Sequence, residues 1–572
     1  MRSDGLRCHG WVDPGDKYWE SGRYNNNVSA TLLARVCEKS SWNPVEMKLS
    51  LSLCLLSAAA SVVARSSLHV NKVLPARQPF VRPVGKTLDK RQAYGRNDTI
   101  LPQNANTTKF AVDGTAIPDV DFDIGEAYAG LLPISNAPNA SQLYFFFQPS
   151  ANVNASDEIT IWLNGGPGCS SLEGLLQENG PFLWQFGTFK PVANNYKWSN
   201  LTNMVWVEQP VGTGFTQGTP TATNEDEAAA QFLGFWKNFI DTFSLHGRKV
   251  FIVGESYAGY FVPYIANAML NTNDTTYYGV DSIMIYDPSL TYDVVQGDLV
   301  ATAYVDYYHT AFNLNATFMA DIHNRSAACG YDDFLATYLS DASFPPKGLL
   351  PTPPNVDFSD DSCFLWGDIY SAASLINPAF DMYQIFTTPP NLWDVLGFPG
   401  SFKYLPPGAE IYFNRTDVQL AINAPVQEWT ECAGGLLGRD TSRPSALSVL
   451  PSVIERTSRT IIGHGKLDYI LIANGSLIAI QNMTFNGAQG FSVPPSQFEE
   501  FYVPYHSELG LGNTAGAGVM GHFHTERGLT YVDIDLSGHM VPQYAPSAAY
   551  RQLEFLLGRI GGLGERGAFT TQ

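Results

Sequence analysis

A serine, an aspartate and a histidine, the residue types that nucleophilic catalysis combines, each follow an apolar run of this chain. Ser256 ends "KVFIVGES" (249–256), Asp468 follows "RTIIGHG" (459–465), and His539 follows "LTYVDIDLSG" (529–538). A serine hydroxyl is a weak nucleophile until an imidazole removes its proton, and a carboxylate must hold that imidazole in the right tautomer. The three residues are therefore candidates for a catalytic triad.

The elements that must position these residues are strands that end in turns. Several runs are continuously apolar, as is typical of central strands that are covered on both faces. Between two of them lies "EDEAAAQFLGFWKNFIDTF" (225–243), whose apolar residues recur at helical spacing behind an acidic first turn. Strand, helix and strand form the unit of a parallel sheet. The expected strands are 158–164, 203–210, 249–254, 282–288, 459–465 and 529–538.

The turn at Ser256 favours one arrangement of that sheet. α/β-Hydrolases expose their serine on a sharp strand-to-helix turn between small residues, and they carry serine, acid and histidine in this order along the chain. Gly254 and Ala258 supply the small residues, with Ala258 in place of the second glycine of the G-x-S-x-G pattern. We predict an α/β-hydrolase fold with a mostly parallel central sheet, flanking helices and an inserted cap region.

The cap region is expected at 291–425, where strand-like runs vanish and Tyr, Pro, Asn and Asp become frequent, as in "SFPPKGLLPTPPNVDF". A separate binding domain is the alternative interpretation. Because sheet-like runs resume after this segment, an insertion into the hydrolase core is the more economical account. The core then comprises 92–290 and 426–560, and 561–572 form a C-terminal tail.

Composition excludes several classes of protein. A chain of 572 residues that is 45% hydrophobic and 13% aromatic can bury a large core, so it is neither disordered nor fibrous. Acidic residues outnumber basic ones 54 to 34, and the net charge of -20 repels phosphate backbones and anionic lipid surfaces. We therefore expect no nucleic-acid partner. The acidic balance also hints at work in an acidic compartment.

The N-terminal region has the pattern of a secretory signal. "MKLSLSLCLLSAAASVVARSS" begins at Met47 with a lysine and an apolar stretch, and it ends in small residues around Val62 and Ala64. We predict a signal peptide at 47–64, an upstream extension of the gene model at 1–46, and a propeptide at 65–91 that ends in a dibasic pair. A buried helix of an N-terminal domain is the alternative. The apolar run is too short to span a bilayer comfortably, so no stable membrane anchor is expected.

Acceptor patterns for N-glycosylation also indicate secretory routing. They occur at Asn97, Asn106, Asn139, Asn154, Asn200, Asn273, Asn315, Asn324, Asn414, Asn474 and Asn482. Of seven cysteines, four lie beyond the signal, which allows three disulfide connectivities that the sequence alone does not distinguish. These four are Cys169, Cys329, Cys363 and Cys432.

Other histidines are competing candidates for chemistry. His464 lies near Asp468, and "GHFHTE" (521–526) places His522 and His524 at a spacing that metal ligands also use. A lone H-x-H lacks the further spaced ligands of a zinc site. We therefore predict neither a metal nor another cofactor.

A glycine-rich segment connects these candidates to a known family. "WLNGGPGCSSLEGLLQENGPF" (162–182), "QPVGTGFTQG" (209–218), "GESYAGYFVPYIA" (254–266) and "SGHMVPQYAP" (537–546), together with the Asp468 segment, resemble the motifs of secreted fungal serine carboxypeptidases. The resemblance covers roughly 110–560. It implies that Ser256 is the nucleophile, Asp468 the orienting acid and His539 the base. It also implies that the backbone N–H groups of Gly166 and Tyr257 form the oxyanion hole.

The resemblance also assigns a role to the acid directly before the serine. In the family, the residue at Glu255 pairs with the one at Glu178, and Trp162, Asn164 and Gly165 complete a site for the terminal carboxylate of the substrate. Two close buried carboxyls cannot both ionise cheaply, so one stays protonated and can donate a hydrogen bond to the substrate. An exopeptidase that works at low pH follows.

The remaining inferences from the resemblance concern disulfides and pockets. The resemblance implies disulfide bonds between Cys169 and Cys432 and between Cys329 and Cys363. A free cysteine of some members is replaced by Leu471, so mercurial sensitivity should be weak. Glu173 and Gln177 take places that face the leaving residue in relatives, and Tyr257, Ile470 and Leu471 take places near the penultimate side chain. The side-chain preference does not follow from these motifs.

Three functional hypotheses result. The first is a serine-type carboxypeptidase that acts on the C-termini of peptides or proteins. The second is an acyltransferase or esterase on the same scaffold, because alcohols or amines can capture an acyl-enzyme. The third is an inactive binding protein of hydrolase fold, against which the complete triad argues. We expect a secreted protein, or else one in a vacuolar or lysosomal lumen, and the oligomeric state is left open.

Overall fold

A computed structural model describes 100–101, 104–357, 359–390, 392–397, 410–438, 440–505 and 517–571. The predicted upstream extension, signal peptide and propeptide, and the acceptor Asn97, lie outside these residues. No helix within the described ranges is long and apolar enough to cross a membrane.

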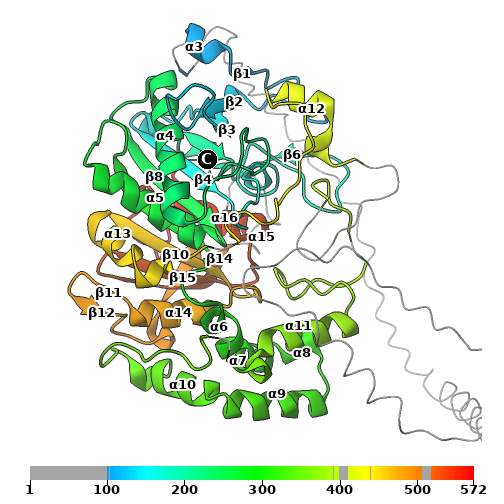
Figure 1. Ribbon diagram of the computed structural model, residues 1–572, viewed down its shortest axis with the longest axis vertical. Helices are drawn as coiled ribbons and strands as arrows, with labels where there is room; N and C mark the ends of the chain where they lie inside the picture. The colour runs from blue at the N-terminus through cyan, green and yellow to red at the C-terminus, as the bar shows by residue number, and fades with distance from the viewer. Residues whose placement is uncertain are drawn as a thin grey trace, which may run out of the picture. The chain divides into compact units, whose positions relative to one another are not determined.

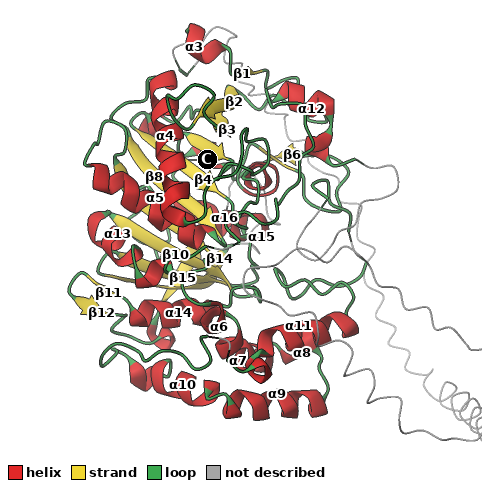
Figure 2. Ribbon diagram, in the orientation of Figure 1, coloured by secondary structure: helices red, strands yellow, loops and turns green. Residues whose placement is uncertain are grey.

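One large sheet organises the described residues (Figures 1 and 2). Its 11 strands follow the order β1-β2-β3-β7-β4-β8-β9-β10-β15-β14-β13. Neighbours from β7 to β15 in this order run parallel, and the strands at both edges run antiparallel. The sheet strands are β1 (Ala111–Val112), β2 (Ala127–Pro133), β3 (Gln142–Gln148), β4 (Glu158–Leu163), β7 (Met204–Val207), β8 (Lys249–Glu255), β9 (Val280–Tyr286), β10 (Arg459–Gly465), β13 (Glu499–Val503), β14 (Gly518–Glu526) and β15 (Leu529–Ile534).

All six predicted strands are present, and they are the parallel ones. Alternate side chains of each strand enter different core layers: in β8, Val250 and Ile252 belong to one layer, and Phe251 and Val253 to the other. Because both layers are buried, these strands read as continuous apolar runs. The predicted fold class is confirmed. Two small hairpins pair β5 (Phe182–Leu183) with β6 (Val192–Ala193) and β11 (Thr484–Phe485) with β12 (Ala488–Gln489).

Helices cover both faces of the sheet. Apolar side chains of α4 and α5 share one core layer, and those of α16 belong to the other. The expected helix at 225–243 is α4, which begins where the Asn224 side chain accepts the Glu227 N–H and ends at Ser244 in a left-handed conformation. The helices outside the predicted cap are α3 (Ala105–Thr108), α4 (Glu225–Phe243), α5 (Ala258–Thr272), α13 (Leu450–Arg456), α14 (Ala473–Asn482), α15 (Val541–Tyr544) and α16 (Pro546–Leu556).

The segment predicted as a cap contains α-helices and no strand within its described residues. Its own apolar core joins residues of several of these helices to Leu467 and Tyr469 beside the sheet. The bounds proposed for the cap and for the two core parts remain predictions. The helices here are α6 (Asp293–Gln296), α7 (Asp298–Tyr307), α8 (His309–Phe312), α9 (Ala316–Ala328), α10 (Tyr331–Tyr338), α11 (Leu365–Ile376) and α12 (Thr416–Ala421).

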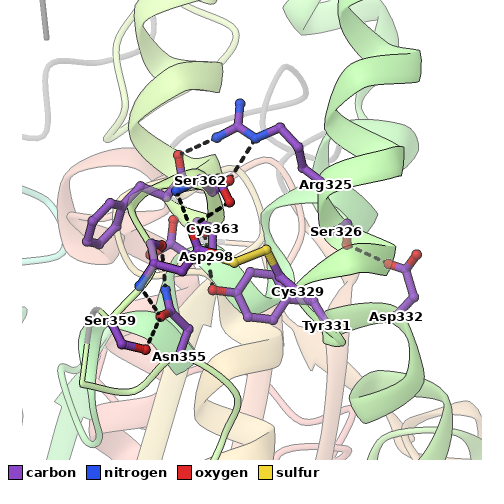
Figure 3. The surroundings of a disulfide bond; sticks show 12 residues. Asp298, Arg325, Ser326, Cys329, Tyr331, Asp332, Asn355, Ser359, Ser362 and Cys363 are labelled. Carbon is purple, nitrogen blue, oxygen red and sulfur yellow. Dashed lines mark hydrogen bonds between the residues drawn. A yellow bond between two sulfur atoms is a disulfide. The ribbon is translucent and has the colours of Figure 1, made fainter.

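A disulfide ties this helical segment together (Figure 3). Cys329 at the end of α9 is bonded to Cys363, which lies just before α11. Arg325 donates to the Ser362 carbonyl at 2.7 Å, and the Tyr331 hydroxyl donates to the Cys363 carbonyl at 3.1 Å. The bond and these contacts fix α9 against the chain that leads into α11.

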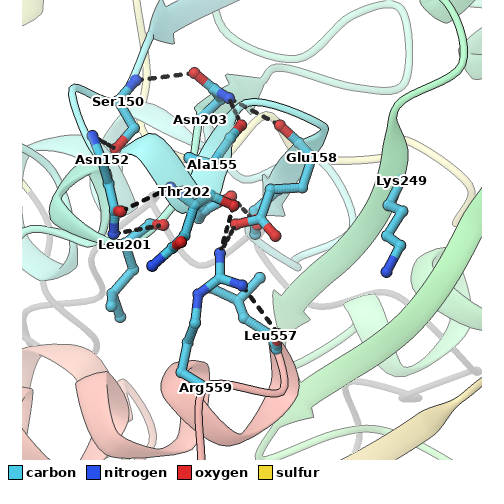
Figure 4. A network of polar contacts seen from close by, with 12 residues as sticks. Ser150, Asn152, Ala155, Glu158, Leu201, Thr202, Asn203, Lys249, Leu557 and Arg559 are labelled. Carbon is cyan, nitrogen blue, oxygen red and sulfur yellow. Dashed lines mark hydrogen bonds and ion pairs between the residues drawn. The ribbon is translucent and has the colours of Figure 1, made fainter. Parts of the chain in front are cut away.

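A polar network lies at the amino-terminal end of β4 (Figure 4). The triad candidates follow the opposite, carboxyl-terminal ends of the parallel strands. Asn203 donates to the Ala155 and Glu158 carbonyls at 2.6 and 2.8 Å, and Arg559 pairs with the Glu158 carboxylate. The predicted C-terminal tail begins just after Arg559. Buried Arg551 of α16 donates to the carbonyl of Glu565 in that tail at 3.0 Å.

Candidate active site

Ser256 lies at a strained turn between β8 and α5. Its φ angle is +62°, a conformation that few residues other than glycine adopt, and its N–H donates to the Tyr286 carbonyl at 2.9 Å. A Cβ on Gly254 would lie 2.6 Å from both the Ala258 Cβ and the Leu163 carbonyl oxygen. Close packing between strand and helix therefore requires a glycine two residues before the serine and a small residue two residues after it.

Asp468 and His539 form a buried pair at the carboxyl ends of neighbouring parallel strands. Nδ1 of His539 lies 2.8 Å from Oδ2 of Asp468. Oδ1 of Asp468 accepts the N–H groups of Ile470 and Leu471 at 2.8 and 3.2 Å, which fixes the carboxylate. Nε2 of His539 is buried and has no hydrogen-bond partner within the described part of the chain. That nitrogen is the one a base would present to a serine hydroxyl.

The glycine-rich turn after β4 packs directly against the serine turn. A Cβ on Gly165 would lie 2.5 Å from the Tyr257 nitrogen and 2.8 Å from the Ser256 Cβ, so only glycine fits. The disulfide between Cys169 and Cys432 holds this turn, and the Ser170 N–H donates to the Glu431 carbonyl at 2.7 Å. Both disulfides join the pairs that the resemblance implies.

Asn164 gathers three carboxyl groups next to this turn. Its Nδ2 lies 2.8 Å from Oε1 of Glu255, 3.2 Å from Oε1 of Glu178 and 3.3 Å from Oε2 of Glu173. The amide is itself oriented, because its Oδ1 accepts the indole N–H of Trp162 at 2.7 Å. Oε2 of Glu178 and Oε2 of Glu255 are buried and have no hydrogen-bond partner among the described residues.

The surroundings of this cluster favour protonated carboxyls. Burial raises the pKa of Glu178 to about 7, against opposing hydrogen bonds from Glu255 and Asn164. Burial, followed by the negative charge of Glu178, raises the pKa of Glu255 well above its usual range. Burial and then the charges of Glu178 and Asp394 do the same to Glu173. At acidic pH the cluster therefore holds protons that it can donate to an anionic ligand.

Comparison with known proteins decides the family. The family model described as serine carboxypeptidase matches 118–558. The chain belongs to the serine carboxypeptidase family. It is accordingly a serine-type carboxypeptidase, a peptide hydrolase that works through an acyl-enzyme.

Individual relatives agree with this assignment. A probable serine carboxypeptidase of Arthroderma benhamiae is 52% identical over 537 residues, which are 90% of this chain and 98% of the relative. Serine-type carboxypeptidase F of Aspergillus niger is 45% identical over 473 residues, which are 80% and 88% of the two chains. The crystal structure of Kex1(delta)p, a prohormone-processing carboxypeptidase from Saccharomyces cerevisiae, has a TM-score of 0.63 at 22% identity and covers 81% of this chain and 99% of its own, a likeness of fold.

The position of Glu173 beside Asn164 in this carboxypeptidase does not follow from the sequence motifs. The residues Gly174–Glu178 form a π-helix, in which the Asn179 N–H bonds to the Gly174 carbonyl at 2.9 Å. Positions five apart lie nearly above one another in such a helix, so Glu173 and Glu178 share a face. An ordinary helix would separate them, and no sequence signal marks the π-helix.

The helical segment also supplies a contact that the sequence did not reveal. The backbone carbonyl of Tyr383 accepts the backbone N–H of His539 at 2.8 Å. The Tyr383 ring packs edge-on against the imidazole, with 5.1 Å between the ring centroids. Positioning of the histidine thus depends on a residue of the predicted cap.

The competing histidines of the carboxypeptidase have different surroundings. His464 is fully buried on β10, and its Nδ1 lies 3.2 Å from Oδ1 of Asp287. His522 and His524 lie on β14, where His524 contacts Glu526 at 3.0 Å. Neither β14 histidine belongs to a described group of side chains that could share an ion.

The predicted glycosylation acceptors differ in exposure. Asn200, Asn414 and Asn482 are half-buried, and Nδ2 of Asn414 donates to the Trp429 carbonyl at 2.9 Å. The exposed ones are Asn106, Asn139, Asn154, Asn273, Asn315, Asn324 and Asn474.

Proposed function

We propose that Ser256, His539 and Asp468 are the catalytic triad of this carboxypeptidase. Nε2 of His539 takes the proton from Oγ of Ser256 while Oγ attacks the last peptide carbonyl. The N–H groups of Gly166 and Tyr257 stabilise the resulting oxyanion. His539 then gives its proton to the departing amino group, the C-terminal amino acid leaves, and a water molecule activated by the same histidine hydrolyses the acyl-enzyme.

We further propose that the cluster around Asn164 recognises the terminal carboxylate. A protonated Glu178 or Glu255 donates to that carboxylate, and Trp162 and Gly165 orient the amide and the turn beside it. The observation that carries this proposal is that Glu255, directly before the nucleophile, and Glu178, which shares the Asn164 amide with it, each keep a buried oxygen without a hydrogen-bond partner among the described residues. The substrates are then the free C-termini of peptides or proteins, cleaved at acidic pH.

Product analysis tests the proposal. The purified protein is incubated across pH with an N-blocked dipeptide and with the same dipeptide carrying a C-terminal amide, and the released products are identified. We expect the free C-terminal amino acid, faster release at acidic pH, and a preference for the free acid. Cleavage of the amide only, or transfer of the blocked residue to an added alcohol with no net hydrolysis, would support the acyltransferase or esterase hypothesis.

We propose in addition that the mature enzyme is secreted. The signal pattern from Met47 and the many exposed acceptor asparagines support this location. Mass spectrometry of the secreted protein should place the N-terminus near Arg65 or shortly after Arg91. Peptides from 1–46 in the secreted form would contradict the predicted start.

A further inference from the structure

A second buried carboxyl lies beside the acid of the proposed triad. Asp287 directly follows β9, the strand between β8 and β10, and its φ angle is +41°. Its N–H donates to the Gly463 carbonyl at 2.7 Å, and its Oδ1 accepts the Gly465 N–H at 2.9 Å. Asp287 is fully buried, and its Oδ2 has no hydrogen-bond partner within the described ranges. The proposed mechanism gives this residue no role.

Asp287, Asp468 and His464 form one compact group. One carboxylate oxygen of each aspartate and a ring nitrogen of His464 lie within 4.8 Å of one another. Exposed fractions are 0% for Asp287, 1% for Asp468 and 0% for His464, so bulk solvent does not screen the interaction between these groups. Two carboxyls at this distance cannot both be ionised cheaply, and one of them keeps a proton.

The hydrogen bonds decide which aspartate is the anion. Asp468 faces three donors, namely two backbone N–H groups and Nδ1 of His539, whereas Asp287 accepts a single backbone N–H. Nδ1 of His464 lies 3.2 Å from Oδ1 of Asp287 but forms no hydrogen bond within the described part of the chain. Donors stabilise the ionised form, so the charge belongs on Asp468 and the proton on Asp287. Burial, followed by the negative charge of Asp468, correspondingly raises the pKa of Asp287 well above its usual range.

Other groups around Asp287 do not supply a compensating positive charge. Burial lowers the pKa of His464 to about 3, so that imidazole is neutral. Lys466 pairs with Asp533 and Asp535, each at 2.8 Å. Among the described residues, the charge of Asp287 also acts on Glu255 on β8, Tyr286 on β9, Tyr304 on α7 and Tyr531 on β15, none of which is a cation.

We propose that Asp287 is a positioning residue that donates a hydrogen bond to Asp468 and so extends the action of His539 to lower pH. The donated bond disperses the negative charge of Asp468. A weaker negative charge attracts the proton on the neighbouring imidazole less strongly, so His539 stays an unprotonated base further into the acidic range. The inference rests on the triad proposed above.

The test compares two variants of nearly equal size. Asp287→Leu removes the donor, and Asp287→Asn keeps one in its amide group. The readout is kcat/KM against pH for a C-terminally amidated peptide, because this substrate depends less on Glu178 and Glu255. We expect Asp287→Leu to move the acid limb upward by about one pH unit, a loss of about tenfold at pH 4 that fades toward pH 7. Asp287→Asn should keep the wild-type limb.

Asp298→Asn is the matched control. Asp298 is another buried aspartate, whose Oδ1 accepts the Trp366 N–H at 2.9 Å in the helical segment, and its substitution should leave the acid limb in place. An equal loss at every pH in Asp287→Leu, or the same shift in Asp287→Asn, would overturn the inference.

Two further measurements keep the outcome decisive. If Asp287→Leu does not fold, infrared spectra of the wild type and of Asp287→Asn are compared at pH 6. The wild type should show a protonated-carboxyl band that the variant lacks. Identical spectra would overturn the inference. Ser256→Ala separates the two proposals. An inactive Ser256→Ala with no effect of Asp287→Leu refutes only the role of Asp287, whereas an active Ser256→Ala refutes the triad.

Discussion

Glu178 and Glu255 share a single amide group, because Nδ2 of Asn164 lies 3.2 Å from Oε1 of the first and 2.8 Å from Oε1 of the second. One glutamate comes from the π-helix after the glycine-rich turn, and the other is the last residue of β8. Each keeps a buried oxygen without a partner in the described structure. A protonated carboxyl of this pair can donate a hydrogen bond to an anionic ligand that reaches it.

Glu255→Gln and Glu178→Gln test this relationship. At acidic pH each variant should lose on the order of two decades in the rate of peptide hydrolysis, because a tuned proton donor to the substrate carboxylate is gone. Toward neutral pH the wild type loses its shared proton while the amide keeps its donors, so the deficit should shrink. The measurement is kcat/KM against pH.

A C-terminally amidated peptide is the control substrate for these variants. It carries no carboxylate, so its hydrolysis should depend little on either glutamate. Wild-type pH profiles in both variants, with the same preference for free over amidated C-termini, would refute the proposed recognition of the carboxylate.

Gly174→Ala tests whether Trp162 must hold the Asn164 amide in place, and it changes no charged group. A Cβ at this position would lie 2.1 Å from Nε1 of Trp162, the nitrogen that orients the Asn164 amide. The indole must move, so we expect kcat/KM for a free-acid peptide to fall by about tenfold or more.

Gly367→Ala is the matched control for that substitution. Gly367 lies inside α11, and a Cβ there would meet nothing within 4 Å. Activity should stay unchanged, and the free energy of unfolding should rise by roughly 0.5–1 kcal/mol. Equal kinetic effects of the two substitutions would contradict the proposed support.

Buried carboxyls should also make the protein more stable in acid. Burial raises the pKa of Glu158, Glu178, Glu208 and Asp381 to about 7, and of Asp298 and Asp394 to about 6. The native state then binds more protons than the unfolded state between about pH 4 and 7. This stabilisation is complete below the unfolded pKa values and is lost as pH rises to the folded ones, at about 1.4 kcal/mol per pKa unit.

Calorimetry at a series of pH values checks the sign of this effect. Tm should fall between pH 4.5 and 7.5. Asp394→Asn keeps the oxygen that accepts from Gln177 but cannot titrate, so its decline in Tm should be shallower. A Tm that rises over this window would be incompatible with protonated buried carboxyls.

The central sheet was predictable because parallel strands buried on both faces leave continuous apolar runs, as in Lys249–Glu255. The antiparallel edge strands were not predicted: β14 alternates half-exposed polar residues with glycine and Phe523, a weaker signal. Motifs located the triad candidates and the glutamate pair. Contacts such as that of Tyr383 with His539 join segments far apart in the sequence, and only the packed structure reveals them.

Labelling with a fluorophosphonate probe tests the central claim, that Ser256 is the nucleophile, most directly. Ser256 combines a positive φ with a position just after β8, at the same carboxyl-terminal side of the parallel strands as Asp468 and His539. Peptide mapping of the labelled protein should find the probe on Ser256 alone, and Ser256→Ala should lose both labelling and the release of C-terminal residues. Labelling at another residue, or turnover that survives in Ser256→Ala, would contradict the claim.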